Sequence, residues 1–175
     1  MKRYSLIGIP VLLLVLIPLG LWWFSEKQVI VRRSEQLMAM LSIDAGTNTI
    51  LRHAKVLGMK SMLAPQVEIS SPDIERANGE FASHDLESAY SWICRNVVAS
   101  RFVISDFRSV TIRGDHAVVV ITVDGFMQLP SDKPVDGKSV VTLRWIKRNG
   151  NWRLRNVIWT RYERHIDANH GTGER

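Results

Sequence analysis

The sequence has few of the residues on which several common protein classes depend. Cys94 is the single cysteine in 175 residues, so no disulfide can form within the chain. The five histidines are scattered and show none of the spacings that hold zinc. We find no nucleophile motif, phosphate loop, internal repeat or low-complexity tract. We therefore expect no metal and no cofactor, and we expect Cys94 to pack in an apolar core.

Strong charge is also lacking. The formal net charge is +6, and Lys2 and Arg3 at the N-terminus contribute two of those charges. Such a modest excess suits a solvated surface or a nearby anionic membrane, and it does not favour nucleic acid as a partner. The hydrophobic content of 46% is that of a folded chain, and about 150 residues after the N-terminal segment are enough for one domain.

One long apolar run is present. Residues 5–24, SLIGIPVLLLVLIPLGLWWF, carry no charge over twenty positions. A helix of that length spans about 30 Å, the thickness of the hydrocarbon layer, and Trp22 and Trp23 then fall at an interface. A cleaved signal peptide is the alternative, but the run is long and no A-x-A-like site follows it. We expect an uncleaved transmembrane anchor, with the short basic N-terminus inside and the remaining chain on the far side.

Helical and extended patterns follow in a definite order. Residues 26–43 and 47–58 have helical spacing, with Gly58 as the expected stop. A short turn, a strand at 66–70 and a polar loop precede a helix that Ser83 is expected to cap. Leu86, Tyr90, Ile93 and Val97 give that helix one apolar face.

After residue 100 the period changes to two. Strands are expected at residues 101–112, 116–129, 138–147 and 151–162. Their links are residues 113–115, residues 130–137 and the Asn149-Gly150 pair. Residues 113–115 read RGD, which could indicate cell adhesion, but Gly114 and Asp115 are typical of a tight hairpin turn, and we interpret them so.

The Asn149-Gly150 turn fixes the register of the last hairpin. Trp145 is then opposite Leu154 and Leu143 opposite Asn156 on the core face, while Arg144 is opposite Arg155 on the outer face. A symmetric loop at 130–137 would place Asp124 opposite Arg144, which predicts an Asp124–Arg144–Arg155 row. The same register extends the core face to the preceding strand through Ala117, Val119, Ile121, Val123 and Met127.

The outer face is predicted to be apolar in places as well. Trp159 is expected there, together with valines and Phe126. A sheet that is apolar on both faces needs a cover on each, so the outer face suggests a second subunit, a partner or the membrane-proximal segment. The candidate interaction residues on this face are Asp124, Arg144, Arg155 and Trp159.

This order of elements resembles the cone-shaped fold of nuclear transport factor 2 and ketosteroid isomerase. The resemblance covers residues 34–162 and depends most on KSMLAPQVEIS and on VVTLRWIKRNGNWRLRNVIW, which is similar to the closing hairpin of those proteins. It implies an α+β fold: an N-terminal transmembrane helix, then a cone of helices packed on a curved antiparallel sheet. The expected divisions are an anchor at 1–25, a helical juxtamembrane segment at 26–46, the cone at 47–163 and a disordered tail at 164–175.

The resemblance leaves the activity open, because that superfamily includes isomerases, dehydratases, binding modules and assembly domains. Its enzymes work in the pocket between sheet and helices, where Tyr90, Trp145 and Asn156 are the ligand-pocket candidates here. No carboxylate is expected to point inward, although a bulge could re-aim Asp106. Several bacterial members pair one N-terminal membrane helix with an extracytoplasmic cone.

We therefore expect a non-catalytic interaction or assembly domain in the bacterial inner membrane, facing the periplasm. Its expected partner is a second copy of the chain or another envelope protein. A binder of small apolar ligands and, as a third class, an isomerase- or dehydratase-type enzyme remain the alternatives.

Overall fold

The computed structural model describes residues 25–71, 78–130 and 134–161. Within these residues the chain forms helices, then short strands, then a run of long strands. The elements in chain order are α2 (Glu26–Leu41), α3 (Thr49–Met62), β1 (Leu63–Ser70), β2 (Gly79–Ala82), α4 (Ser83–Asn96), β3 (Ala99–Arg113), β4 (His116–Gln128), β5 (Val135–Arg148) and β6 (Asn151–Arg161).

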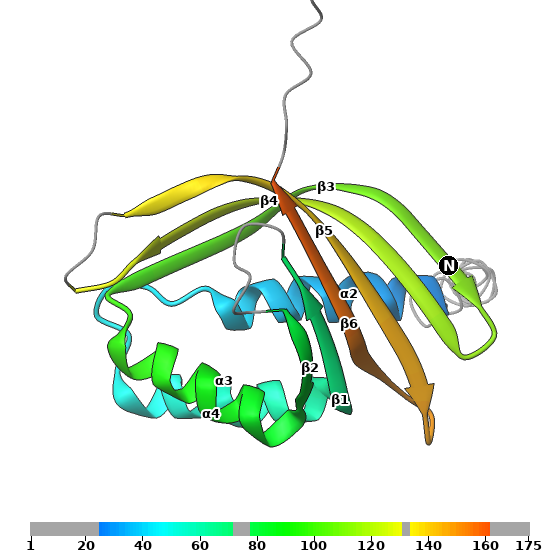
Figure 1. Cartoon of the computed structure of the whole chain (residues 1–175), viewed down its shortest axis with the longest axis horizontal. Coiled ribbons are helices and arrows are strands. Elements are labelled where there is room, and N and C mark those ends of the chain that lie inside the picture. The colour runs from blue at the N-terminus through cyan, green and yellow to red at the C-terminus, as the bar shows by residue number, and fades with distance from the viewer. Residues whose placement is uncertain (1–24, 72–77, 131–133, 162–175) are drawn as a thin grey trace, which may run out of the picture.

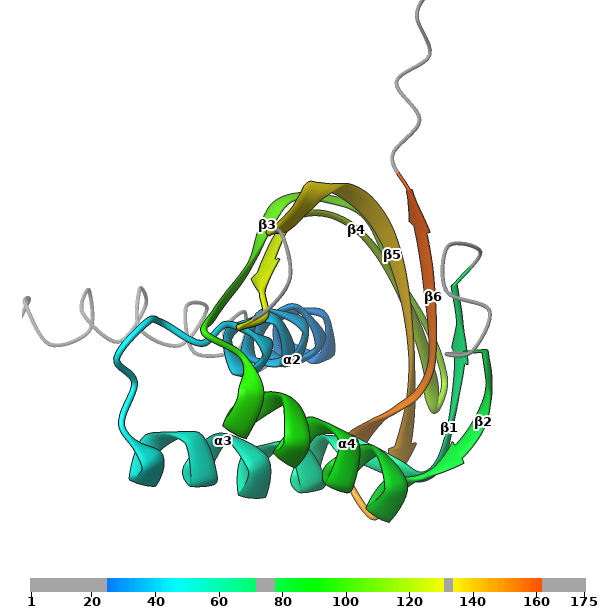
Figure 2. The ribbon, with the colours of Figure 1, turned by 60° about the vertical axis from the view of Figure 1, so that its left-hand side comes forward.

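The strands form one curved sheet in the order β2-β1-β6-β5-β4-β3. The sheet bends around α2, and α3 and α4 lie across its open side (Figure 1, Figure 2). The predicted antiparallel meander of β3 to β6 is confirmed. However, the sheet is mixed, because β1 pairs with β6 in parallel while β2 pairs antiparallel with β1.

The core lies between α2 and the concave face of the sheet. The alternation predicted for β4 is confirmed, since Ala117, Val119, Ile121 and Val123 are all at most 1% exposed. Helix α2 adds apolar side chains to the same core, namely Ile30, Leu37 and Met38. Residues 26–41 therefore pack as a part of the cone.

Two tight turns are where the sequence placed them. Gly114 has φ +56° between β3 and β4, and Asn149 and Gly150 have φ +50° and +75° between β5 and β6. Side chains with a Cβ rarely adopt this left-handed region, so Gly and Asn are the residues that such turns require.

A β-bulge interrupts the last hairpin. The pairs from Arg148–Asn151 to Trp145–Leu154 agree with the prediction, but Arg144 then pairs with Asn156 and leaves Arg155 as the extra residue. Because side chains alternate along a strand, one extra residue moves every later side chain to the opposite face. The expected faces of Asn156 and Trp159 were therefore wrong: Asn156 lies outside beside Arg144, and Trp159 lies opposite the buried Val141.

The expected register between β4 and β5 was also wrong. Trp145 lies opposite Ala117 rather than Val123, and Asp124 lies opposite Lys138 rather than Arg144. Residues 130–137 were predicted to be a loop, but residues 135–137 already belong to β5 and pair with β4. The shift is six residues, an even number, so the predicted inner face of β4 is unaffected.

Three local expectations about the helices and the polar loop also differ from the structure. Gly58 lies inside α3 rather than at its end, and a Cβ there would approach the methyl group of Met40 to 2.8 Å. Its absence of a side chain therefore serves the close packing of α2 and α3. Ser83 is the first helical residue of α4 and Ala82 is the N-cap, without a side-chain cap. The polar loop contains the short strand β2.

The structure does not test the anchor. None of the helices in residues 25–161 that it describes is long and apolar enough to cross a membrane. The uncharged run at 5–24 and the expected tail at 164–175 both lie outside the described residues.

Candidate functional site

The concave side of the sheet is where the sequence placed a ligand pocket. Two of the three pocket candidates are there: Trp145 is 1% exposed and Tyr90 is 5% exposed, and both belong to the apolar core. Met59 and Met62 from α3 fill space in the same cluster. The side chains of the chain itself therefore occupy the interior that an enzyme of this shape would use for substrate.

The Tyr90 hydroxyl is already engaged. It donates a hydrogen bond to the backbone carbonyl of Met40, which lies in α2. Burial raises the pKa of Tyr90 well above its usual range, and a hydrogen bond with the Cys94 thiol raises it further. Tyr90 is thus kept neutral and tied to the backbone, so it links α4 to α2.

No carboxylate is among the fully buried side chains of the described residues. The polar side chains that are buried there are all neutral: Ser34, Ser71, Ser100, Thr122 and Asn156. Asp106 follows a register irregularity in β3, as the sequence allowed, but its side chain is exposed. Acid–base catalysis needs a positioned ionisable group. The described part of the core holds Tyr90, whose hydroxyl is bonded to the carbonyl of Met40, and Cys94, and its carboxylate candidate Asp106 is exposed. The indole Nε1 of Trp145 is buried without a hydrogen-bond partner among the described residues.

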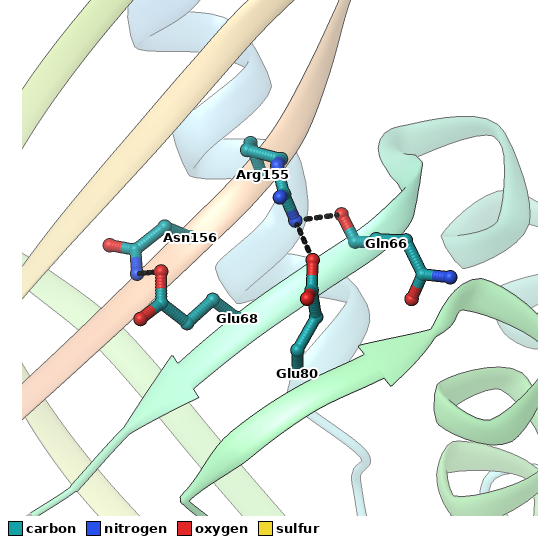
Figure 3. Close-up of polar contacts among 5 residues, drawn as sticks. All are labelled: Gln66, Glu68, Glu80, Arg155 and Asn156. Carbon is teal, nitrogen blue, oxygen red and sulfur yellow. Dashed lines mark hydrogen bonds and ion pairs between the residues drawn. The ribbon is translucent and has the colours of Figure 1, made fainter.

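Asn156, the third pocket candidate, belongs to a polar cluster on the outer side of the sheet (Figure 3). Its Nδ2 donates to Glu68 Oε2 at 2.9 Å, which links β6 to β1. Arg155 Nη1 donates to the carbonyl oxygen of Gln66 at 3.0 Å and to Glu80 Oε1 at 2.8 Å. Because the bulge at Arg155 breaks the alternation of side chains, Arg155 and Asn156 both reach partners on this side of the sheet. The cluster therefore joins β1, β2 and β6 next to an open cavity of about 460 Å³.

The expected row of Asp124, Arg144 and Arg155 does not form. Asp124 Oδ1 lies 3.6 Å from Lys138 Nζ, and both side chains are about half exposed. Arg144 lies between Val118 of β4 and Asn156 of β6. The three residues share the outer face without forming a row. Trp159, the fourth interaction candidate, packs edge-on against Phe102 with ring centroids 5.9 Å apart, so it is not available on that face.

A second cavity, of about 310 Å³, lies between α3 and α4. It is lined by Thr47, Thr49, Arg52, His53, Val56, Ser91, Cys94, Arg95 and Val97. Arg52 closes one side, because its guanidinium donates to the carbonyls of Cys94 and Val97 at the end of α4. The lining has basic groups and hydroxyls but no acid, so it could attract a small anion. The sequence signal for it was the acid-free stretch from Ala45 to Val67.

The described fold is similar to that of solved NTF2-like proteins. An NTF2-like protein from Cytophaga hutchinsonii is 17% identical with a TM-score of 0.61, covering 79% of this chain and 100% of that one. A proposed dehydratase of the NTF2-like family from Streptomyces avermitilis is 13% identical with a TM-score of 0.60, covering 80% and 98%. A CaMKII hub from S. rosetta is 14% identical with a TM-score of 0.56, covering 79% and 98%.

These likenesses confirm the expected NTF2-like fold and extend to nothing finer. No protein-family model matches the chain, and no curated protein matches it in sequence. Since the similar structures include both a proposed dehydratase and a hub, the fold alone does not select an activity.

Proposed function

We propose that this protein is a membrane-anchored, non-catalytic interaction domain that assembles with a second copy of itself. The observation that carries the proposal is the buried apolar cluster inside the cone, to which the pocket candidates Tyr90 and Trp145 belong. Because these pocket candidates pack in the core, the outer surfaces of the domain are the candidates for function.

The anchor in this proposal is the uncharged run at 5–24, which is long enough to span the hydrocarbon layer. Lys2 and Arg3 precede the run and Lys27, Arg32 and Arg33 follow it, so the charges on the two flanks are nearly balanced. A short N-terminal tail with basic residues usually stays inside, and on that ground we propose that the cone faces the extracytoplasmic side of a bacterial inner membrane. Alkaline extraction of membranes and protease protection of the C-terminal end would test retention and orientation separately.

The outer face of β4, β5 and β6 is the surface that we propose for self-association. Its centre carries half-buried apolar side chains, namely Val118, Val120, Val140, Ile146 and Ile158. Charges of both signs surround them, including Asp124, Lys138, Arg144 and Arg155. A face with an apolar centre and mixed charges around it can match its own copy across a two-fold axis. One of the similar structures is described as a hub, which agrees with this use of the fold.

Native mass spectrometry of the full-length protein, released gently from its membrane, tests self-association. We expect multiples of the chain mass, and we expect Arg144→Glu to lower the multimer fraction because it reverses a charge on the outer face. Arg148→Glu is the matched control, since it makes the same change at the tip of the last hairpin. A monomer in every case would contradict the proposal. Loss of multimers in both variants would contradict the choice of face.

A further inference from the structure

Helix α3 presents apolar side chains to solvent. Ile50 is 78% exposed, Leu51 55% and Leu57 73%, and Ala54 beside them is exposed as well. Positions 50, 54 and 57 share one side of the helix, as the sequence indicated. The opposite side carries Met59 and Met62 into the core. We call the four residues Ile50, Leu51, Ala54 and Leu57 the outer stripe of α3; none of them is covered by the described residues.

The charge on α3 itself has one sign. The helix contains Arg52, His53, Lys55 and Lys60 and no acidic residue, and Lys60 Nζ lies 3.8 Å from Oε2 of Glu87 on α4. Arg95 adds another positive charge from α4, beside the cavity that His53 also lines. Basic residues that flank an apolar helical stripe are typical of helices lying in the surface of an anionic membrane.

The same charges argue against a second copy as the cover. Two α3 helices packed face to face would bring like charges together, which opposes association. A stripe of four side chains on one helix is also small compared with the roughly 800 Å² that each partner buries in a typical stable interface.

The chain before α2 would hold this helix near a membrane. The uncharged run ends at Phe24, and α2 begins at Glu26. Ser25 between them has an extended backbone, with φ −60° and ψ 143°, and caps α2 through a hydrogen bond from Gln28 N at 3.4 Å. Because Ser25 caps α2, this helix begins within two residues of the end of the uncharged run. In Figure 2, α3 lies along the lower edge of the domain, below α2.

We propose that the outer stripe of α3 lies in the interface of a bilayer rich in anionic lipids. Its apolar side chains enter the boundary of the acyl chains, and the exposed side chains of His53 and Lys60 beside them face the phosphates. The inference rests on the proposed anchor, which supplies the proximity, and it adds a second membrane contact that orients the cone. The bilayer would then cover the apolar side chains that α3 exposes.

Nitroxide labels on single introduced cysteines in the full-length chain test this contact. Leu57→Cys reports the outer stripe, and Val135→Cys is the matched control because Val135 is 71% exposed on a strand. Leu13→Cys reports the anchor. Native Cys94 is 2% exposed, so it should not react with the label. Each protein is reconstituted in vesicles of phosphatidylglycerol and phosphatidylcholine, and collision of the label with oxygen and with a polar nickel complex is measured.

We expect the label at position 57 to lose collisions with the nickel complex and gain collisions with oxygen, while the label at 135 stays accessible to nickel. Adding Lys60→Gln should reduce the inserted fraction roughly fivefold, the effect of one basic residue at an anionic surface. A label at 57 as accessible to nickel as that at 135 overturns the inference. If Leu13 is then still protected, the anchor stands alone; if not, the anchor fails as well. Spin–spin broadening at 57 that grows with protein density would identify a second copy and also overturn it.

Discussion

The hydroxyl of Tyr90 is the clearest case of a polar group whose role is set by burial. It is 5% exposed and donates to the carbonyl of Met40. Burial, and then the Cys94 thiol, raise the pKa of Tyr90 above the value of about 10 that it has in the unfolded chain. Below pH 10 both states keep the proton, so this group adds no pH dependence there. Above pH 10 the unfolded state loses its proton first, so the stability of the fold decreases as pH rises.

Tyr90→Phe should remove this alkaline sensitivity. The wild-type free energy of unfolding is expected to decrease above pH 10 by up to about 1.4 kcal/mol per pH unit from this group, and the variant should lack that contribution. Urea titrations between pH 9 and 11 measure both slopes. Lys147, whose pKa is raised by its hydrogen bond with Glu26, contributes equally in both proteins, so the comparison reports Tyr90 together with its contact to the Cys94 thiol. Equal slopes in the two proteins would mean that the Tyr90 hydroxyl ionises freely in the fold.

At the scale of the element, the bulge in β6 decides which residues belong to which face. Leu154 precedes the bulge and is buried as the turn predicts. Trp159 follows the bulge and lies on the face opposite to the one that the turn predicts. The extra residue, Arg155, uses its position to bond to β1 and β2. The bulge therefore interrupts the regular alternation of side chains in β6, and its extra residue links the meander to β1 and β2.

Substitution of two tryptophans distinguishes the two faces. Trp159 is half-buried against Phe102, so Trp159→Ala should lower the free energy of unfolding by about 2–3 kcal/mol, somewhat below the range for a fully buried tryptophan. Trp92 on α4 is 53% exposed, so Trp92→Ala should change it by less than about 0.5 kcal/mol. Denaturant titration of both variants gives the values. Equal, small effects would place Trp159 on the outer face, as the unbroken register predicts.

The sequence predicted most elements and missed what depends on neighbours. Alternation in β4 and β5 is a local signal that led to the correct inner face, and the Asn149-Gly150 turn gave the correct pairing as far as Trp145 and Leu154. The bulge at Arg155 has no such signal, because its partners Gln66 and Glu80 are far away in sequence. For the same reason Asn156 could not be placed in the outer cluster. Gly58 looked like a helix stop because its reason for being small, contact with Met40, comes from another helix.

At the scale of the whole molecule, α2 packs against the concave side of the curved sheet and completes the core of the cone (Figure 2). Ile30 is fully buried, and Leu37 and Met38 are 4% and 3% exposed. The end of α2 is joined to β3 by reciprocal backbone hydrogen bonds of 2.8 Å between Ile43 and Ser100. Its start is joined to the last hairpin by the ion pair of Glu26 with Lys147. The helix is therefore held at both ends, although its sequence alone suggested a juxtamembrane segment.

Two truncated chains test whether the cone requires α2. A chain of residues 25–161 keeps α2 and should unfold cooperatively, with the helical and strand content of the full domain by circular dichroism. A chain of residues 47–161 begins at the boundary that the sequence suggested, and it lacks Ile30, Leu37 and Met38, which belong to the buried cluster on the concave face. Exposure of that concave face should leave it aggregated or without a cooperative transition, because the lost burial amounts to several kcal/mol. Cooperative unfolding of the shorter chain at a similar temperature would show that α2 packs on a cone that is stable without it.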